Sequence, residues 1–227
     1  MLGSLAQPIL FLIALGFGFG PVFSKAGEGN YLQFLTPGII AMSILFSATF
    51  SGIEVIWDRQ FGFLKETLVA PVSRLKIMIG RTLGGATIAT IQGFIVFLLS
   101  LLVGFRPQSI FAIFVSLIFM FLIALIFTAV GTIIASFMDD FHGFQIIMNF
   151  LIMPLFFLSG AIFPLKSLPK LISIISSFNP LSYGVDGVRG VLTGLNHFNL
   201  YQDFTILSII AIIFITLGAC SFSKIQV

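Results

Sequence analysis

Six long apolar runs constrain the fold of this chain more than any other feature of its sequence. A helix needs about 20 apolar residues to cross the roughly 30 Å hydrocarbon core of a membrane. The runs are continuous and lack the alternation of apolar and polar residues that is typical of membrane-barrel strands. The sequence therefore predicts an all-α integral membrane protein whose 227 residues form one transmembrane domain. The expected membrane-spanning helices cover about residues 2–23, 34–57, 82–105, 109–138, 144–164 and 204–222.

The composition supports this class and excludes several others. Charged residues make up 8% of the chain, against roughly 25% in a typical soluble domain, so we exclude a water-soluble fold. The net charge of +3 is too small to indicate nucleic-acid binding. Cys220 is the only cysteine, which excludes a disulfide within the chain and a Cys-x-x-Cys metal or redox site.

Much of the charge lies between the second and third expected spans. This segment, residues 58–81, contains five basic residues: Arg59, Lys65, Arg74, Lys76 and Arg81. Basic residues close to the ends of spans favour the cytoplasmic side of a membrane. Six crossings would leave both chain termini on the same side as this segment. We therefore expect both termini to be cytoplasmic.

A short amphipathic helix is expected within this charged segment. It would begin near Asp58, as a plausible N-cap, or near Phe61. It would end by Val69, because Pro71 disfavours helical backbone at the residue before it. Three apolar residues share one face of this helix: Phe61, Leu64 and Leu68. Two interpretations stay open, a helix lying on anionic lipid and a docking site for a partner protein.

The segment before the last expected span is rich in residues that interrupt or start helices. The interrupting residues are Ser159, Gly160, Pro164 and Pro169. Asn179 can then cap a new helix that has Pro180 in its first turn. We expect two short re-entrant or interfacial helices here, which form either an outer gate over a transport path or a structural cap. Asp186 and Arg189 are three residues apart on the second of these helices and could form an ion pair.

Several stretches of the sequence resemble permease subunits of type-2 ABC transporters. One is WDRQFGFLKETLVAPVSRLKIMIGR at residues 57–81, and another is FHGFQIIMNFLIMP at 141–154. A third begins with SGAIFPLKSLP at 159–169 and ends with NPLSYGVDGVR at 179–189. The resemblance extends from about Phe34 onward and is greatest to the drug-resistance and nodulation-factor export branch. Family members usually begin with a cytoplasmic amphipathic helix and basic residues, whereas this sequence opens with Met1-Leu2-Gly3.

This resemblance implies the membrane-spanning subunit of an ATP-driven exporter in the plasma membrane. The substrate would be hydrophobic or amphipathic, such as a drug-like molecule or a lipid-linked compound. Two copies of the chain, as a homodimer, would form the transport path. Separate ABC ATPase subunits would bind ATP and Mg²⁺, so we expect no catalytic residue, cofactor or metal on this chain.

The resemblance also implies roles for two sets of residues. The helix in the charged segment would be the coupling helix that docks on the ATPase, with Arg59 and Glu66 as polar contacts. The coupling residues would be Arg59, Phe61, Gly62, Leu64, Lys65, Glu66, Leu68 and Pro71. The outer gate would include Ser159, Gly160, Pro164, Pro169, Asn179, Pro180, Tyr183, Asp186 and Arg189.

Other classes stay open beside this one. A polysaccharide- or glycolipid-exporting permease of the same family would differ in its substrate. A secondary transporter usually has ionisable groups at the centre of its spans, but Glu54, Asp139 and Asp140 lie near span ends. An intramembrane enzyme that used Asp139 and Asp140 with His142 would need a second acidic motif, which the sequence lacks. A structural membrane protein is the last alternative, and a neighbouring reading frame for a P-loop ATPase would favour the exporter instead.

Overall fold

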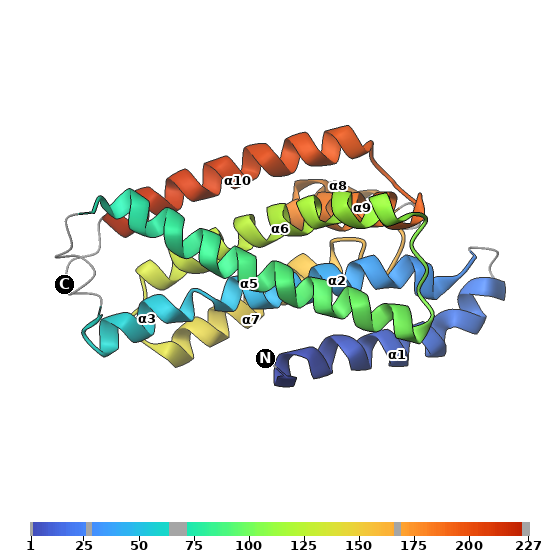
Figure 1. Cartoon of the computed structure of the whole chain (residues 1–227), viewed down its shortest axis with the longest axis horizontal. Helices are drawn as coiled ribbons and strands as arrows, with labels where there is room; N and C mark the ends of the chain where they lie inside the picture. Colours follow the sequence, from blue (N-terminus) through green and yellow to red (C-terminus); the bar gives the residue numbers. More distant parts are fainter. Residues whose placement is uncertain (1, 26–28, 64–71, 166–168, 224–227) are drawn as a thin grey trace.

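The computed structural model describes residues 2–25, 29–63, 72–165 and 169–223 of the chain. All regular secondary structure in these residues is helical, which confirms the expected all-α class. The helices lie side by side in an elongated bundle (Figure 1). They are α1 (Leu2–Lys25), α2 (Tyr31–Phe50), α3 (Ile53–Gln60), α5 (Arg74–Val103), α6 (Ile110–Ser136), α7 (Phe141–Phe157), α8 (Lys170–Phe178), α9 (Pro180–Thr193) and α10 (Leu200–Ser223).

Five helical segments in the described part of the chain are long and apolar enough to cross a membrane: α1, α2 with α3, α5, α6 and α10. They correspond to the first four expected spans and the sixth. The fifth expected span, 144–164, is too long, because α7 has 17 residues and ends at Phe157. At 1.5 Å per residue, α7 is about 26 Å long. The chain turns after it at Gly160, whose φ of 73° is a backbone conformation that cannot continue a helix.

The bundle has two ends, and one of them holds two ion pairs. One end holds the end of α3, the start of α5, the turn between α6 and α7, and the end of α10 (Figure 1). We call it the charged end, because Asp58, Arg59, Arg81 and Asp139 lie there. The end of α1, the start of α2 and the connections from α5 to α6 and from α9 to α10 lie at the opposite end, which we call the gate end (Figure 1). The basic segment that we expect to be cytoplasmic therefore starts and finishes at one end of the molecule.

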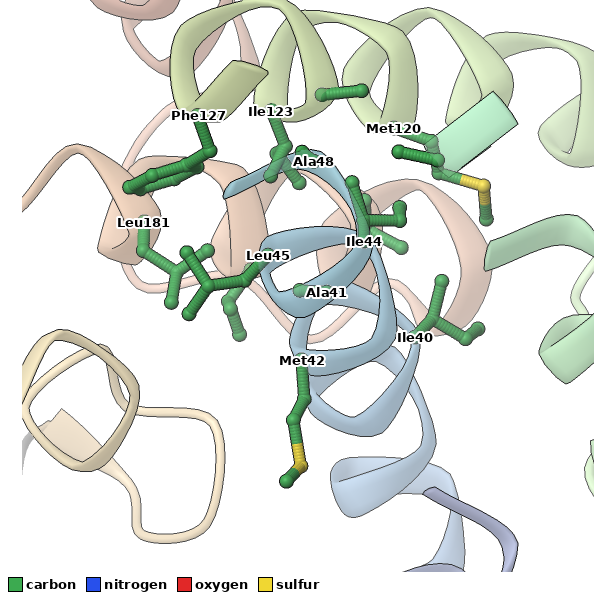
Figure 2. Close-up of a cluster of buried hydrophobic side chains, with 14 of the residues drawn as sticks. Ile40, Ala41, Met42, Ile44, Leu45, Ala48, Met120, Ile123, Phe127 and Leu181 are labelled. Carbon is green, nitrogen blue, oxygen red and sulfur yellow. The ribbon is translucent and has the colours of Figure 1, made fainter. Parts of the chain in front are cut away.

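α2 forms the centre of the bundle. Most of its residues are buried, and it packs against α1, α5, α6 and α9. Figure 2 shows apolar side chains of α2 meeting those of α6 and α9. The cluster includes Ile40, Ile44, Leu45 and Ala48 of α2, Met120, Ile123 and Phe127 of α6, and Leu181 of α9. Close packing of this kind holds helices together in lipid, where the hydrophobic effect between helices is absent.

Two glycines allow the α2–α3 junction to cross α6 at very close range. A Cβ at Gly52 would overlap the carbonyl oxygen of Gly131, and a Cβ at Gly131 would overlap the carbonyl oxygen of Thr49. α2 ends beside this crossing, and α3 begins directly after Gly52. Asp58 therefore lies in the last turn of α3, and the prediction that it is an N-cap is wrong.

The two short helices expected before the last span are present as α8 and α9. Asn179 separates them and caps α9, because its Oδ1 accepts a hydrogen bond from the N–H of Leu181 at 3.0 Å. Pro180 follows at the first position of α9, as the sequence predicts. α9 is buried between α2, α6 and α10, whereas α8 exposes large apolar side chains such as Leu171 and Phe178. α9 is therefore an internal helix, and α8 lies on the outside of the bundle.

Candidate coupling end and outer gate

Arg59 joins α3 to the turn between α6 and α7 at the charged end. Its Nη1 donates a hydrogen bond to the carbonyl oxygen of Met138 at 3.0 Å, and its Nη2 donates to that of Ser136 at 3.0 Å. The guanidinium also forms an ion pair with Asp139. Gln60 adds a hydrogen bond from Nε2 to the carbonyl oxygen of Asp139 at 3.0 Å. The end of α3 is thus held against the turn that leads into α7.

Two further contacts join α3 to neighbouring helices. Asp58 forms an ion pair with Arg81 in α5. Trp57 stacks on Phe141, the first residue of α7, with 6.3 Å between the ring centroids. α3 therefore contacts the starts of α5 and α7 as well as the end of α6.

The predicted coupling residues divide into two groups. Phe61 is 72% exposed and Gly62 has a φ of 81°, at the point where the chain leaves α3. The positions that the structure does not describe are Leu64, Lys65, Glu66, Leu68 and Pro71. Arg59 is predicted from the sequence to contact a partner, but its guanidinium binds its own chain and its side chain is only 21% exposed. The sequence carries no signal for this, because Asp139 lies 80 positions away.

Arg189 holds the gate end together from a buried position on α9. Its Nε donates a hydrogen bond to the carbonyl oxygen of Phe34 in α2 at 3.1 Å. Its Nη2 donates to the carbonyl oxygens of Gly160 and Ala161 at 3.0 and 3.2 Å. The guanidinium carbon lies 3.9 Å from the centroid of the Phe34 ring, which adds a cation–π contact. Arg189 therefore joins α9 to α2 and to the connection between α7 and α8.

Asp186 does not form the expected ion pair with Arg189, although both residues are described by the structure. Its carboxylate instead accepts hydrogen bonds from the N–H groups of His197 at 2.8 Å and Phe198 at 2.7 Å. The i, i+3 spacing permits a pair but does not require one. Both side chains form hydrogen bonds with backbone groups outside α9. Asp186 thereby holds the connection from α9 to α10 in place, and Arg189 holds α9 against α2.

Polar side chains at the start of α9 bind the far end of α7. Asn179 donates from Nδ2 to the carbonyl oxygen of Leu155 at 2.6 Å. Ser182 donates from Oγ to the carbonyl oxygen of Leu158 at 3.4 Å. These carbonyl groups belong to the last turn of α7 and its C-cap, where no intrahelical donor remains. α9 thus completes the hydrogen bonding of α7.

A cavity of about 160 Å³ lies beside Arg189 at the gate end. Four predicted gate residues line it: Ser159, Pro164, Asp186 and Arg189. No sequence motif indicates the other lining residues, which are Phe23, Phe34, Leu165, Ser182, Leu195, Asn196 and His197. The remaining predicted gate residues shape the helices. Gly160 makes the turn after α7, Pro169 precedes α8, and Asn179 and Pro180 start α9. The hydroxyl of Tyr183 donates a hydrogen bond to the carbonyl oxygen of Ser177 at 2.7 Å.

Within the described residues, no group of three or more His, Cys, Asp or Glu side chains is placed to hold a metal ion. Asp139 and Asp140, next to His142, have other partners. Asp139 pairs with Arg59. Asp140 caps α7, because its Oδ2 accepts a hydrogen bond from the N–H of Gly143 at 2.7 Å. These carboxylates therefore serve the fold of the charged end.

Comparison with known proteins shows the family of this chain. The profile of the ABC-2 type transporter family matches residues 2–193. The chain is 32% identical over 196 residues to the putative transport permease ycf38 of Cyanophora paradoxa. The aligned region covers 83% of this chain and 66% of that relative. It is 28% identical over 196 residues to nodulation protein J of Rhizobium leguminosarum bv. viciae. Here the aligned region covers 86% of this chain and 75% of that relative. The chain therefore belongs to the ABC-2 type transporter family and is a multi-pass membrane transport permease.

Proposed function

We propose that this permease is the membrane-spanning subunit of an ATP-driven exporter, in which residues 1–227 form one permease domain and a separate ABC ATPase docks at the charged end. The observation that carries this proposal is the set of contacts around α3. The helix that leads into the charged segment is bonded to α5, to the α6–α7 turn and, through Trp57, to α7. A displacement of the charged segment would therefore reach three other helices.

ATP would bind to the partner and not to this chain. The sequence contains no G-x-x-x-x-G-K-[ST] phosphate-binding motif. The partner would hold ATP and Mg²⁺ and hydrolyse the nucleotide, while this chain would carry the transported molecule. The proposed cargo is hydrophobic or amphipathic, either a drug-like molecule or a lipid-linked compound.

α7 offers a route from the charged end to the gate end within one chain. It begins beside Asp139, which pairs with Arg59. Its other end is bonded to α9 through Asn179 and Ser182. ATP can drive transport only if it favours one conformation of the membrane subunit over another. In this proposal a shift of α3 displaces α7, and α7 displaces the outer gate formed by α8 and α9.

A second copy of the chain is proposed to complete the transport path. α7 carries Gln145 and Asn149 four residues apart, and both side chains are exposed. Amide side chains in a membrane helix usually face protein or water rather than lipid. Phe150 beside them is 83% exposed. We therefore place the partner copy of the homodimer against α7.

Co-purification of the tagged chain from its native membrane tests the ATPase partner. We expect a P-loop ATPase in an equal amount.

Glu66→Lys is expected to lose the ATPase and to abolish transport without preventing membrane insertion, because it reverses a charge on the proposed docking helix. Arg59→Gln is expected to keep the ATPase, to reduce transport, and to lower the free energy of unfolding by about 2 kcal/mol, because it removes hydrogen bonds within the chain.

The two variants are each other's control. An intact, folded permease that brings no ATPase would contradict the exporter proposal. Loss of the ATPase in Arg59→Gln, with retention in Glu66→Lys, would move the docking contact from the proposed helix to α3. Normal transport by Glu66→Lys would remove that residue from the mechanism.

We also propose that the protein lies in the plasma membrane with both termini in the cytoplasm. The end of α10 lies at the charged end, together with the start of α5 and its basic residues (Figure 1). Basic residues at span ends favour the cytoplasmic side. A tag placed after Val227 is expected to react with a membrane-impermeant reagent only after the cells are permeabilised. Labelling of that tag in intact cells would reverse the orientation.

A further inference from the structure

A second, larger cavity lies on the side of the bundle between α1, α2 and α5, and three of its lining residues, Gln7, Glu54 and Ile88, are exposed. Its volume is about 400 Å³, and side chains from α1, α2, α3 and α5 line it. This volume is within the range of known small-molecule sites. Met42, which lines the cavity, points to the side of α2 opposite Ile123 and Phe127 (Figure 2). The cavity therefore lies across α2 from the packed core. We call it the α1–α2–α5 cavity.

Hydroxyl groups form a line along the side of α2 that faces this cavity. Ser43, Ser47 and Ser51 follow one another at four-residue intervals, and all three line it. The Oγ of Ser51 donates to the carbonyl oxygen of Ala48 at 2.6 Å. The Oγ of Ser43 is different, because it is buried and has no hydrogen-bond partner. A buried hydroxyl without a partner costs free energy in a membrane interior.

Two amide side chains complete the polar lining. Gln7 of α1 and Gln92 of α5 both line the cavity. Neither side chain makes a hydrogen bond to any residue that the structure describes. Gln92 is 9% exposed, whereas the side chain of Gln7 is exposed. Three helices thus direct unpaired polar groups into one cavity, where a bound molecule could satisfy them.

The charge of the lining selects among possible ligands. Among the described residues that line the cavity, Glu54 is the only ionisable one, and its side chain is exposed. None of these described lining residues is a Lys, Arg or His that could pair with an anion. Phe46, Phe50 and Ile88 provide apolar surface beside the polar groups. The site therefore combines hydrogen-bonding groups and apolar walls with a small negative charge.

We propose that the α1–α2–α5 cavity binds the cargo, and that the cargo is an amphipath whose head group is uncharged and carries hydroxyl or amide groups. The amides of Gln7 and Gln92 and the hydroxyl of Ser43 bind the head group, since each can both donate and accept a hydrogen bond. The apolar part lies along Phe46 and Phe50. Glu54 disfavours anionic head groups. The identification of this ligand as cargo rests on the proposed export function, whereas the binding itself does not.

Photolabelling tests the site directly. The full chain in lipid nanodiscs is exposed to an alkyl maltoside that carries a diazirine on its alkyl chain, and the labelled peptides are mapped by mass spectrometry. We expect saturable labelling of the parts of α1, α2 and α5 that line the cavity. Unlabelled decyl maltoside should compete for it, and decyl phosphate should not. No nucleotide or ATPase is present, so failure of the exporter proposal would leave this result unchanged.

Variants separate binding from folding. Gln92→Leu and Ser43→Ala are expected to lower the saturable labelling by about three- to tenfold, the effect of one lost hydrogen bond. Their unfolding temperatures should be unchanged or higher, because each variant removes an unpaired polar group. Thr87→Val, on an exposed position of α5, is the matched control and should label normally.

Three results would overturn the proposal. One is labelling spread evenly over the outside of the bundle. Another is full labelling of both Gln92→Leu and Ser43→Ala. The third is better competition by a charged amphipath, either decyl phosphate or decyltrimethylammonium. If decyltrimethylammonium competes better with the original chain but not with Glu54→Gln, the Glu54 carboxylate attracts a cationic head group and the proposed uncharged head group is wrong.

Discussion

Arg189→Met is expected to destabilise the protein by about 3–5 kcal/mol. The methionine would fill much of the same space but would leave the carbonyl oxygens of Phe34, Gly160 and Ala161 without their donor. A buried acceptor that loses its partner costs about 1–3 kcal/mol. α9 would then lose its polar link to α2 and to the connection between α7 and α8. The protein should unfold at a much lower temperature and aggregate on extraction.

Thermal unfolding followed by size-exclusion chromatography measures this effect. Arg189→Lys should be intermediate, because an ammonium group keeps the charge but cannot match the geometry of the guanidinium with three carbonyl groups. Arg106→Met is the control, since Arg106 is exposed in the connection between α5 and α6 and surface changes usually stay within about 0.5 kcal/mol. Equal unfolding temperatures for Arg189→Met and Arg106→Met would show that Arg189 does not hold the gate end together.

The sequence predicts the helices well because their signals are local. Apolar runs fix the spans, and Asn179 followed by Pro180 fixes the start of α9. The same local reasoning fails for the ends of elements that depend on contacts elsewhere. The fifth span is shorter than expected, since the chain turns at Gly160. Asp58 is not a cap, since α3 begins at the crossing between Gly52 and Gly131.

Side-chain partners are the part of both sites that the sequence did not predict. The i, i+3 spacing suggested that Asp186 and Arg189 bind each other, whereas Arg189 binds a carbonyl group 155 positions away. Arg59 likewise binds a turn 80 positions away. The other carbonyl groups that these two arginines bind lie at or just after the ends of α6 and α7, where no helical N–H follows to satisfy them. Such carbonyls become visible only when the tertiary fold is known.

Gly131→Ala is expected to have the second large effect, a loss of about 3 kcal/mol of stability. The added methyl group would overlap the carbonyl oxygen of Thr49, which is backbone and cannot turn aside as a flexible side chain would. Gly52 faces the same crossing from the α2–α3 junction. α6 and the α2–α3 junction would have to separate, and α3 would move away from the α6–α7 turn. The ion pair between Arg59 and Asp139 depends on that position of α3.

Gly84→Ala provides the matched control within the same bundle. A Cβ at Gly84 would meet no atom within 4 Å, and alanine is favoured over glycine in a helix by about 1 kcal/mol. Gly84→Ala should therefore unfold at the same temperature as the original chain or slightly higher. If Gly131→Ala also unfolds at the original temperature or higher, α6 and the α2–α3 junction can separate at low cost. Their close crossing then does not hold α3 against α7. Loss of stability in Gly131→Ala alone would tie the geometry of the charged end to this single backbone contact.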